Sequence, residues 1–252
     1  MRITARLHSM EPHAPHLSRL VAREVLIALG AVVVYFGVRG LTEGQVDLAK
    51  ANAGRVIDVE SWLGVFREAQ LQDLLLVDHA LVTVFNWIYI WGHWPVIGIT
   101  AVWLVLTQPG HYRLFRNGFL ISGAVGLVIF ATFPVAPPRL LDIGIADTVT
   151  QHSDSYRVLQ PPAFVNQYAA MPSLHFGWNL LIGIALFTYG RSRVVKVLGI
   201  LSPIAMGSAV VLTGNHFILD AAAGGTLALV GLYVAWHIHP EPDTAFAGGR
   251  AE

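Results

Sequence analysis

Long apolar runs without a charged side chain are the feature that most constrains this chain. Residues 117–138, 197–219 and 221–240 contain no Asp, Glu, Lys or Arg. Each run has about the length that an α-helix needs to cross roughly 30 Å of hydrocarbon. Hydrophobic residues make up 54% of the chain and charged residues 13%, about half the share of a soluble domain. The sequence therefore predicts an all-α integral membrane protein.

Two further spans follow from the same reasoning. Residues 20–41 are apolar except for charges near the two ends, where long side chains can extend to the membrane surface. Residues 158–190 also contain no Asp, Glu, Lys or Arg, but Pro161, Pro162 and Pro172 interrupt the run. Its helix is therefore predicted over residues 173–190.

The run over residues 79–111 is too long for one ordinary span and too short for two. An aromatic cluster before Pro95 resembles the belt that membrane proteins place at the interface, with a lipid-substrate groove as the alternative interpretation. The cluster consists of Phe85, Trp87, Tyr89, Trp91 and Trp94. We expect an interfacial helix followed by a span over residues 94–108, which gives a bundle of six transmembrane helices.

The predicted organisation is a single membrane domain over residues 21–239. A cytoplasmic segment, residues 1–20, precedes it, and a cytoplasmic tail, residues 240–252, follows it. An outer amphipathic segment, residues 42–92, lies between spans one and two, and an outer active-site loop is expected over residues 137–172. Most of the 16 Lys and Arg side chains fall in the predicted inner segments. The expected location is the plasma membrane, with both termini in the cytoplasm and the active site outside.

Composition also excludes several function classes. The 16 basic and 16 acidic residues balance, so the chain has no basic excess with which to bind nucleic acid. The absence of Cys excludes a thiolate metal site and a Cys nucleophile. The chemistry must come from other side chains.

Three polar clusters lie at the ends of predicted helices: residues 137–139, 171–175 and 214–220. The first ends span three, the second begins span four, and the third lies between spans five and six. Because two crossings separate the second cluster from the third, all three fall on the same side of the membrane. We expect their side chains to converge there.

The residue types in these clusters suit phosphoryl transfer without a metal. His216 and Asp220 are four residues apart, so on a helix the carboxylate can orient the imidazole and leave its other nitrogen as a nucleophile. His175 could protonate a leaving oxygen. Arg139 and Ser173 offer donors for phosphate, and we place Asn215 with them.

Here the sequence resembles the type 2 phosphatidic acid phosphatase superfamily, whose membrane enzymes have six helices. The resemblance covers roughly residues 118–237. The family's Pro-Ser-Gly-His motif appears as Pro172-Ser173-Leu174-His175, and its His-x-x-x-Asp pattern as His216 to Asp220. This resemblance implies a phosphohistidine on His216, orientation by Asp220, acid and base catalysis by His175, and phosphate binding by Arg139 and Ser173. No cofactor or metal is implied.

Two family positions differ. The Lys seven residues before Arg139 is replaced by Thr132, and the Arg six residues before His216 is replaced by Val210. The surrounding Ala-Pro-Pro-Arg and Asn-His-Phe sequences resemble the branch of inositol phosphorylceramide synthases and their bacterial relatives, which transfer phosphoryl head groups between lipids.

A phosphate in a poorly solvated site needs more than one cation. The stretch over residues 53–74 is amphipathic, and Glu60 and Arg67 fall on its apolar face. We therefore hypothesise that Arg67 supplies part of the missing positive charge and that Glu60 lies near the substrate. Candidates for contact with the head group in the outer loop are Asp147, Arg157, Asn166 and Tyr168.

The sequence predicts an enzyme that hydrolyses or transfers the phosphoryl group of a lipid phosphate or prenyl diphosphate, within a membrane whose lipids surround it. Transfer to an inositol or sugar alcohol instead of water is an alternative. Binding of a metal by the two His and the Asp, anchoring of single residues at the interface, and a lipid-phosphate transporter or flippase are further alternatives.

Overall fold

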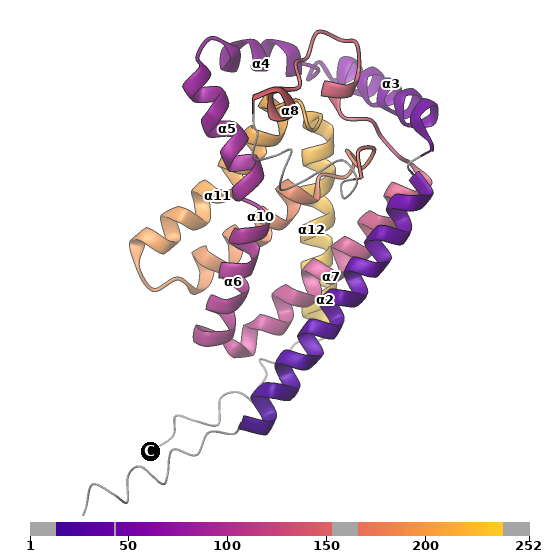
Figure 1. Cartoon of the computed structure of the whole chain (residues 1–252). Helices are drawn as coiled ribbons and strands as arrows, with labels where there is room; N and C mark the ends of the chain where they lie inside the picture. The colour runs from indigo at the N-terminus through magenta and orange to yellow at the C-terminus, as the bar shows by residue number, and fades with distance from the viewer. Residues whose placement is uncertain (1–13, 43, 153–165, 239–252) are drawn as a thin grey trace, which may run out of the picture.

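The computed structural model describes residues 14–42, 44–152 and 166–238. Within these ranges the chain is helical, and no β-strand is formed (Figure 1). Strand-like pairing in this part of the chain is limited to an isolated parallel β-bridge between Val135 and Ala169. The all-α class expected from the apolar runs is confirmed.

Three helices in the described part of the chain are long and apolar enough to cross a membrane: α7 (Pro109–Thr132), α11 (Arg193–Leu212) and α12 (Ile218–Ile238). A fourth span results if α5 (His79–Trp91) and α6 (Trp94–Thr107) cross together, with a bend of 49° between them. These apolar helices indicate a membrane protein.

Six spans are not confirmed. Helix α10 (Leu174–Tyr189) has 16 residues and is too short to qualify by length. Helix α2 (Ala14–Thr42) is long enough, but its apolar stretch also carries Arg23, Glu24 and Arg39. Several of its large apolar side chains are exposed, as on the outside of a membrane bundle.

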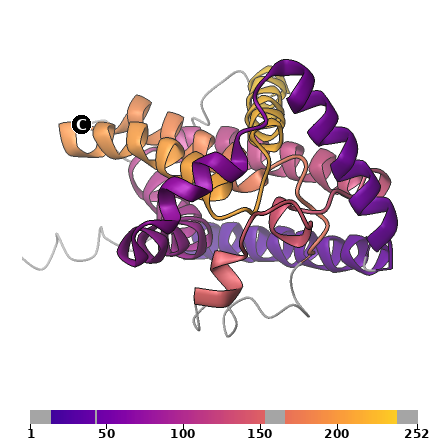
Figure 2. The ribbon, with the colours of Figure 1, turned by 90° about the horizontal axis from the view of Figure 1, so that it is seen from above.

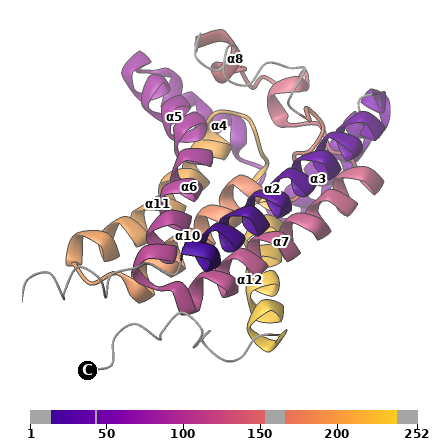
Figure 3. The same cartoon turned by 60° about the horizontal axis from the view of Figure 1, so that its bottom comes forward.

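Helix α10 lies in the middle of the bundle and packs against α7, α11 and α12 (Figure 3). Its start approaches α12 closely, because a Cβ atom at Gly224 would overlap the carbonyl of Ser173. Farther along, Leu181 and Ala185 pack into a core that contains Ala228 of α12. This packing sets the start of α10 directly beside the start of α12.

The outer segment predicted over residues 42–92 forms α3 (Val46–Leu63), α4 (Glu68–Leu76) and α5, and its amphipathic stretch over residues 53–74 is divided between α3 and α4. Gly64 ends α3 in the left-handed conformation, with φ of 72°, and its N–H bonds to the carbonyl of Ser61. Glycine adopts this conformation without steric cost. The segment therefore does not continue as the single helix expected over residues 53–74.

The helix break changes which residues are buried. Ala53, Val56 and Glu60 of the predicted face are buried. The expected pattern is wrong from the end of α3 onward, because Leu63 and Leu74 are exposed, while α4 buries Glu68, Gln72 and Leu75. Seen from above, α3, α4 and α5 form an arc around one end of the bundle (Figure 2).

The break before the span at residue 94 is where the sequence predicted it, and Pro95 lies in the first turn of α6. Helix α5 is more than a peripheral interfacial helix, because it packs against α11. It buries Asn86, Tyr89 and Ile90 and exposes Trp87 and Trp91 on its other side.

The predicted outer loop contains a 3₁₀ turn, η1 (Pro138–Leu140), and a short helix, α8 (Thr148–His152). Its two ends are joined, since the N–H of Val135 donates to the carbonyl of Tyr168 and the N–H of Ala170 donates to the carbonyl of Val135. The tail over residues 240–252 and most of the segment over residues 1–20 lie outside the described residues.

Candidate active site

His216 lies just before α12 and is 4% exposed. Its Nδ1 is 2.7 Å from the carbonyl oxygen of Ala170. A carbonyl oxygen can only accept, so Nδ1 carries the hydrogen and the neutral ring keeps its lone pair on Nε2. Ala170 is itself held by its N–H bond to Val135. The bridge between the loop ends therefore fixes the tautomer of His216.

Asp220 differs from the expected arrangement. Its Oδ2 lies 3.6 Å from Nδ1 of His216, beyond hydrogen-bonding distance, although the pair is close enough for an ionic contact when the ring is protonated. The same oxygen accepts a hydrogen bond of 2.8 Å from the N–H of Phe217. Asp220 thus caps the start of α12 and places a carboxylate beside the imidazole, while a backbone carbonyl sets the ring orientation.

Arg139 reaches this cluster from η1. Its Nε donates to Oδ1 of Asn215 at 2.8 Å, and its backbone N–H donates to the carbonyl of Gly214 at 2.9 Å. Its Nη1 forms an ion pair with Asp147. Both polar atoms of the Asn215 side chain are hydrogen-bonded, because Oδ1 accepts from Arg139 and Nδ2 donates to the hydroxyl of Thr213. Asn215, the residue before His216 in the chain, therefore orients the buried guanidinium of Arg139.

Gly214 makes this close approach possible. Its φ is +70°, and a Cβ atom there would lie 2.7 Å from Cγ2 of Ile145 and 3.3 Å from Cβ of Arg139. Only glycine fits both the left-handed backbone and the narrow space. The turn between α11 and α12 is thereby held against Arg139.

Ser173 and His175 lie at the start of α10. The buried Ser173 caps this helix, accepting a hydrogen bond from the N–H of Phe176, and its own N–H donates to the carbonyl of Asp220 at 2.9 Å. The rings of His175 and His216 are 5.9 Å apart, centre to centre. This short distance places both imidazoles at one site, where the His175 side chain is half-buried.

His93 is a third imidazole that the motifs do not include. Its ring centre is 4.1 Å from that of His175, and it stacks on Trp178 at 5.7 Å. His93 is 2% exposed, and its Nδ1 has no partner among the described residues. Tyr89 stacks on His175 from α5, with ring centres 4.8 Å apart. The aromatic pattern before Pro95 pointed to a membrane belt, but its inner face encloses His175.

The remaining residues proposed from the sequence make contacts that join elements of the fold. Glu60 bonds to the N–H of Leu219, and Asn166 accepts a hydrogen bond from Thr42 and donates its N–H to Tyr35. Both connect parts of the fold. Tyr168 packs against the core that contains Phe217.

Arg67 is exposed at the N-cap of α4, and Arg157 lies outside the described residues. Asp147 contacts the cluster through Arg139. Of the four residues expected to contact the head group, Asn166 links separate parts of the fold and Tyr168 packs in the core. Asp147 forms the ion pair with Arg139, and Arg157 is not among the described residues.

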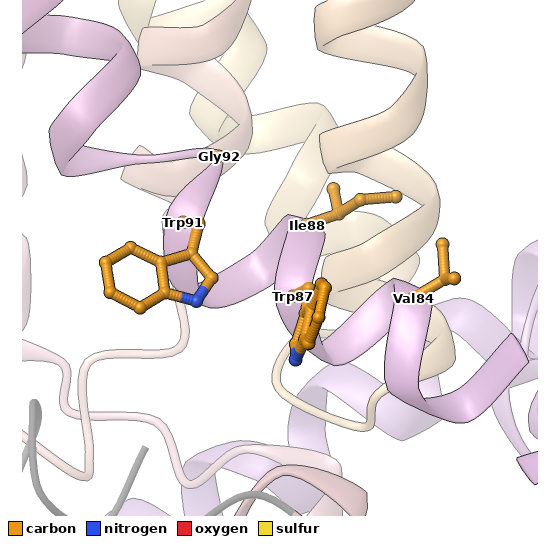
Figure 4. A pocket seen from close by; sticks show the side chains of 5 residues that line it. All are labelled: Val84, Trp87, Ile88, Trp91 and Gly92. Atoms are coloured by element: carbon orange, nitrogen blue, oxygen red, sulfur yellow. The ribbon is translucent and has the colours of Figure 1, made fainter. Parts of the chain in front are cut away.

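A groove of about 760 Å³ lies on the other side of α5 from Tyr89. Its lining is apolar and consists of Val84, Trp87, Ile88, Trp91 and Gly92 (Figure 4). Figure 4 shows the two Trp side chains projecting from the helix. The groove lacks the polar groups that phosphoryl chemistry needs, so the candidate site is the cluster around His216.

Comparison with known proteins gives one result. The sequence model of the PAP2 superfamily matches residues 54–234, a range that includes every helix from α4 to α11 and most of α12. No curated protein and no solved structure matches the chain. Within the described residues, no group of three or more His, Asp or Glu side chains is arranged to hold a metal ion.

Proposed function

From the premise that the chain belongs to the type 2 phosphatidic acid phosphatase (PAP2) superfamily, we propose that it transfers the phosphoryl group of a lipid phosphate or prenyl diphosphate to water. Membership supports a phosphatase-type or phosphotransferase-type enzyme. The substrate, the phosphohistidine intermediate and the outer membrane face are parts of the proposal.

One observation carries it. The proton on Nδ1 of His216 is fixed by the carbonyl of Ala170 at 2.7 Å, so the Nε2 lone pair is available to attack phosphorus. The buried guanidinium of Arg139 is hydrogen-bonded to Asn215, the residue before His216 in the chain. A nucleophile of fixed tautomer and a cation held by the same turn are suited to phosphoryl transfer.

In the first step Nε2 of His216 forms a bond to phosphorus, and the bond from phosphorus to the leaving oxygen breaks. His175 gives its proton to that oxygen. The negative phosphate favours the protonated form of His175 before this step. Asp220, 3.6 Å from Nδ1, stabilises the positive charge that develops on the His216 ring.

In the second step His175 takes a proton from water, and the resulting hydroxide oxygen attacks phosphorus. The bond between phosphorus and Nε2 breaks, and inorganic phosphate leaves. An inositol or sugar alcohol in place of water would make the enzyme a phosphotransferase, as the resemblance to the inositol phosphorylceramide synthase branch suggests. Both versions use the same intermediate.

An amphiphilic substrate is supported by the surroundings of the site. Tyr89 faces His175 on one side of α5, and an apolar groove lies on the opposite side of the same helix. The apolar chain of a lipid could lie against such a groove while its phosphate enters the site. We propose a plasma-membrane protein with both termini in the cytoplasm and the site outside.

The test measures inorganic phosphate released by the detergent-purified protein from lipid phosphates and prenyl diphosphates, with chelator present. His216→Ala should reduce release by at least about a thousandfold, because the nucleophile is lost. His237→Ala is the matched control, since this exposed His at the other end of α12 also bonds to a backbone carbonyl. We expect the control variant to retain wild-type turnover.

The assay is repeated with inositol or a sugar alcohol present. A phosphorylated alcohol in place of free phosphate would identify the phosphotransferase. Movement of lipid phosphate across vesicles that survives His216→Ala, with no product in either assay, would reject catalysis in favour of a transporter.

A further inference from the structure

Three carboxylates hold the first free N–H groups of α12. The N–H of Phe217 donates to Asp220 at 2.8 Å and that of Ile218 to Glu68 at 2.9 Å, and the N–H of Leu219 donates to Glu60 at 2.6 Å. Glu60 comes from α3 and Glu68 from α4. The two outer helices thus bind the short segment that separates His216 from Asp220.

All three carboxyl groups are buried, with exposures of 0% for Glu60, 1% for Glu68 and 0% for Asp220. One oxygen of each carboxyl group accepts a hydrogen bond from a backbone N–H of this segment. The second oxygen of each is buried and has no hydrogen-bond partner in the described part of the chain. An ionised carboxylate in this condition is costly, and the three are not arranged to share a metal ion.

Glu60 and Glu68 accept from the N–H groups of two adjacent residues, Leu219 and Ile218, so their carboxyl groups are held side by side. One proton between their free oxygens would satisfy both groups, because a protonated carboxyl can donate to a carboxylate. Burial, together with the neighbouring Glu68 and Asp220 carboxylates, raises the pKa of Glu60 to about 8, while the N–H of Leu219 opposes the shift. This is how closely spaced carboxyl groups behave when both cannot ionise.

We infer that Glu60 and Glu68 share a single proton and act as positioning residues that hold the segment from His216 to Asp220 in its reactive geometry. The link to catalysis rests on the proposed function. The shared proton limits the negative charge beside Asp220 and the incoming phosphate. The positive end of the α12 dipole offsets the charge that remains.

Loss of this proton should disturb the site. The titratable groups that act on Glu60 are Glu68 from α4 and Asp220 at the start of α12, and the other buried residues of α3 are uncharged. Above about pH 8 two ionised glutamates would face each other near Asp220. Their repulsion would loosen both caps on α12, so turnover falls while substrate affinity changes little.

The first experiment measures kcat and KM for phosphate release from about pH 6 to about pH 9.5. Glu60→Gln keeps an acceptor for Leu219 and gives Glu68 a permanent donor. We expect the alkaline decline of the wild-type kcat to move upward by at least about one pH unit in this variant. Glu60→Leu removes the cap, and its kcat should fall about tenfold with KM within about twofold.

Asp58→Asn is the matched control, because it removes one carboxylate from the exposed face of α3. Its pH profile should follow that of the wild type. Superimposable profiles for wild type and Glu60→Gln would overturn the inference.

A second measurement does not need activity. The infrared absorption of a protonated carboxyl should be present in the wild type and in Asp58→Asn at neutral pH, disappear above about pH 8, and be absent from Glu60→Gln. A wild type without this band has no shared proton. A wild type that releases no phosphate at any pH would reject the proposed function, and the infrared band would still decide the state of the glutamate pair.

Discussion

Arg139 and Asp147 form an ion pair in which Nη1 and Oδ2 are 2.9 Å apart, and their side chains are only 7% and 17% exposed. The second oxygen of Asp147 accepts the N–H of Thr150 at the start of α8. A carboxylate resembles a phosphate in charge and in its acceptor oxygens. Under the proposed function, Asp147 therefore occupies a donor of Arg139 that a substrate phosphate would use.

Asp147→Asn should strengthen phosphate binding. Without the competing charge, the KM for a phosphorylated substrate and the inhibition constant of inorganic phosphate should each fall about threefold to tenfold. Steady-state kinetics measure both values. Asp142→Asn, in an exposed position of the same loop, is the control and should leave them unchanged. Weaker binding in Asp147→Asn would show that the carboxylate orients Arg139 instead of competing with substrate.

Gly214→Ala should damage both stability and activity. The added Cβ would lie 2.7 Å from Ile145 in a backbone with φ of +70°. Gly144→Ala is a matched control, because Gly144 has φ of +78° with nothing within 4 Å. The control should cost only about 1–2 kcal/mol of left-handed strain. Melting temperatures in detergent and phosphate release should both fall further in Gly214→Ala, and equal losses would mean that the contact with Ile145 is unimportant.

Gly224→Ala tests the contact between α10 and α12. A Cβ atom there would overlap the backbone of Ser173, so the two helices must separate and His175 must move away from His216. We expect turnover to fall at least about tenfold. Gly98→Ala in α6 meets nothing within 4 Å, and should be neutral or stabilise by up to about 1 kcal/mol. Unchanged turnover in Gly224→Ala would contradict the close packing.

Stability should fall as pH rises from about 4.5 to about 8. Burial raises the pKa of Glu60 from 4.5 to about 8, so in this window the folded protein binds more protons than the unfolded chain. The stabilisation is fully present below about 4.5 and is lost as pH rises through the folded value. The melting temperature in detergent measures this trend. Glu60→Gln cannot titrate, and its curve should be flatter than that of the wild type.

Much of the helical architecture could be predicted from the chain. The apolar runs located α7, α11 and α12, and Pro95 located the start of α6. The grouping of Arg139, Ser173 and His216 could be expected because each lies at a helix end on one side. The count of six spans could not be settled, since charges within α2 and the shortness of α10 make length and hydropathy ambiguous.

The rest of the site depends on contacts that helical periodicity does not encode. A single helix through residues 53–74 places Arg67 on the buried face, but the turn at Gly64 changes the register and buries Glu68 instead. Likewise His93 precedes α6 in a stretch typical of a membrane interface, and only the packing of α6 against α10 brings it to His175. Such contacts arise from tertiary packing between distant segments.

The acceptor that fixes His216 is the main-chain carbonyl of Ala170, which no side-chain substitution can delete. Alanine scanning would therefore pass over a principal determinant of the nucleophile and attribute its effect to Asp220. Replacing the peptide bond between Ala170 and Met171 by an ester, a much weaker acceptor, would weaken that interaction and leave every side chain unchanged, with the N–H of Met171 as the only group lost. The tautomer of this histidine is therefore set by the backbone and does not depend on which side chain stands at position 170.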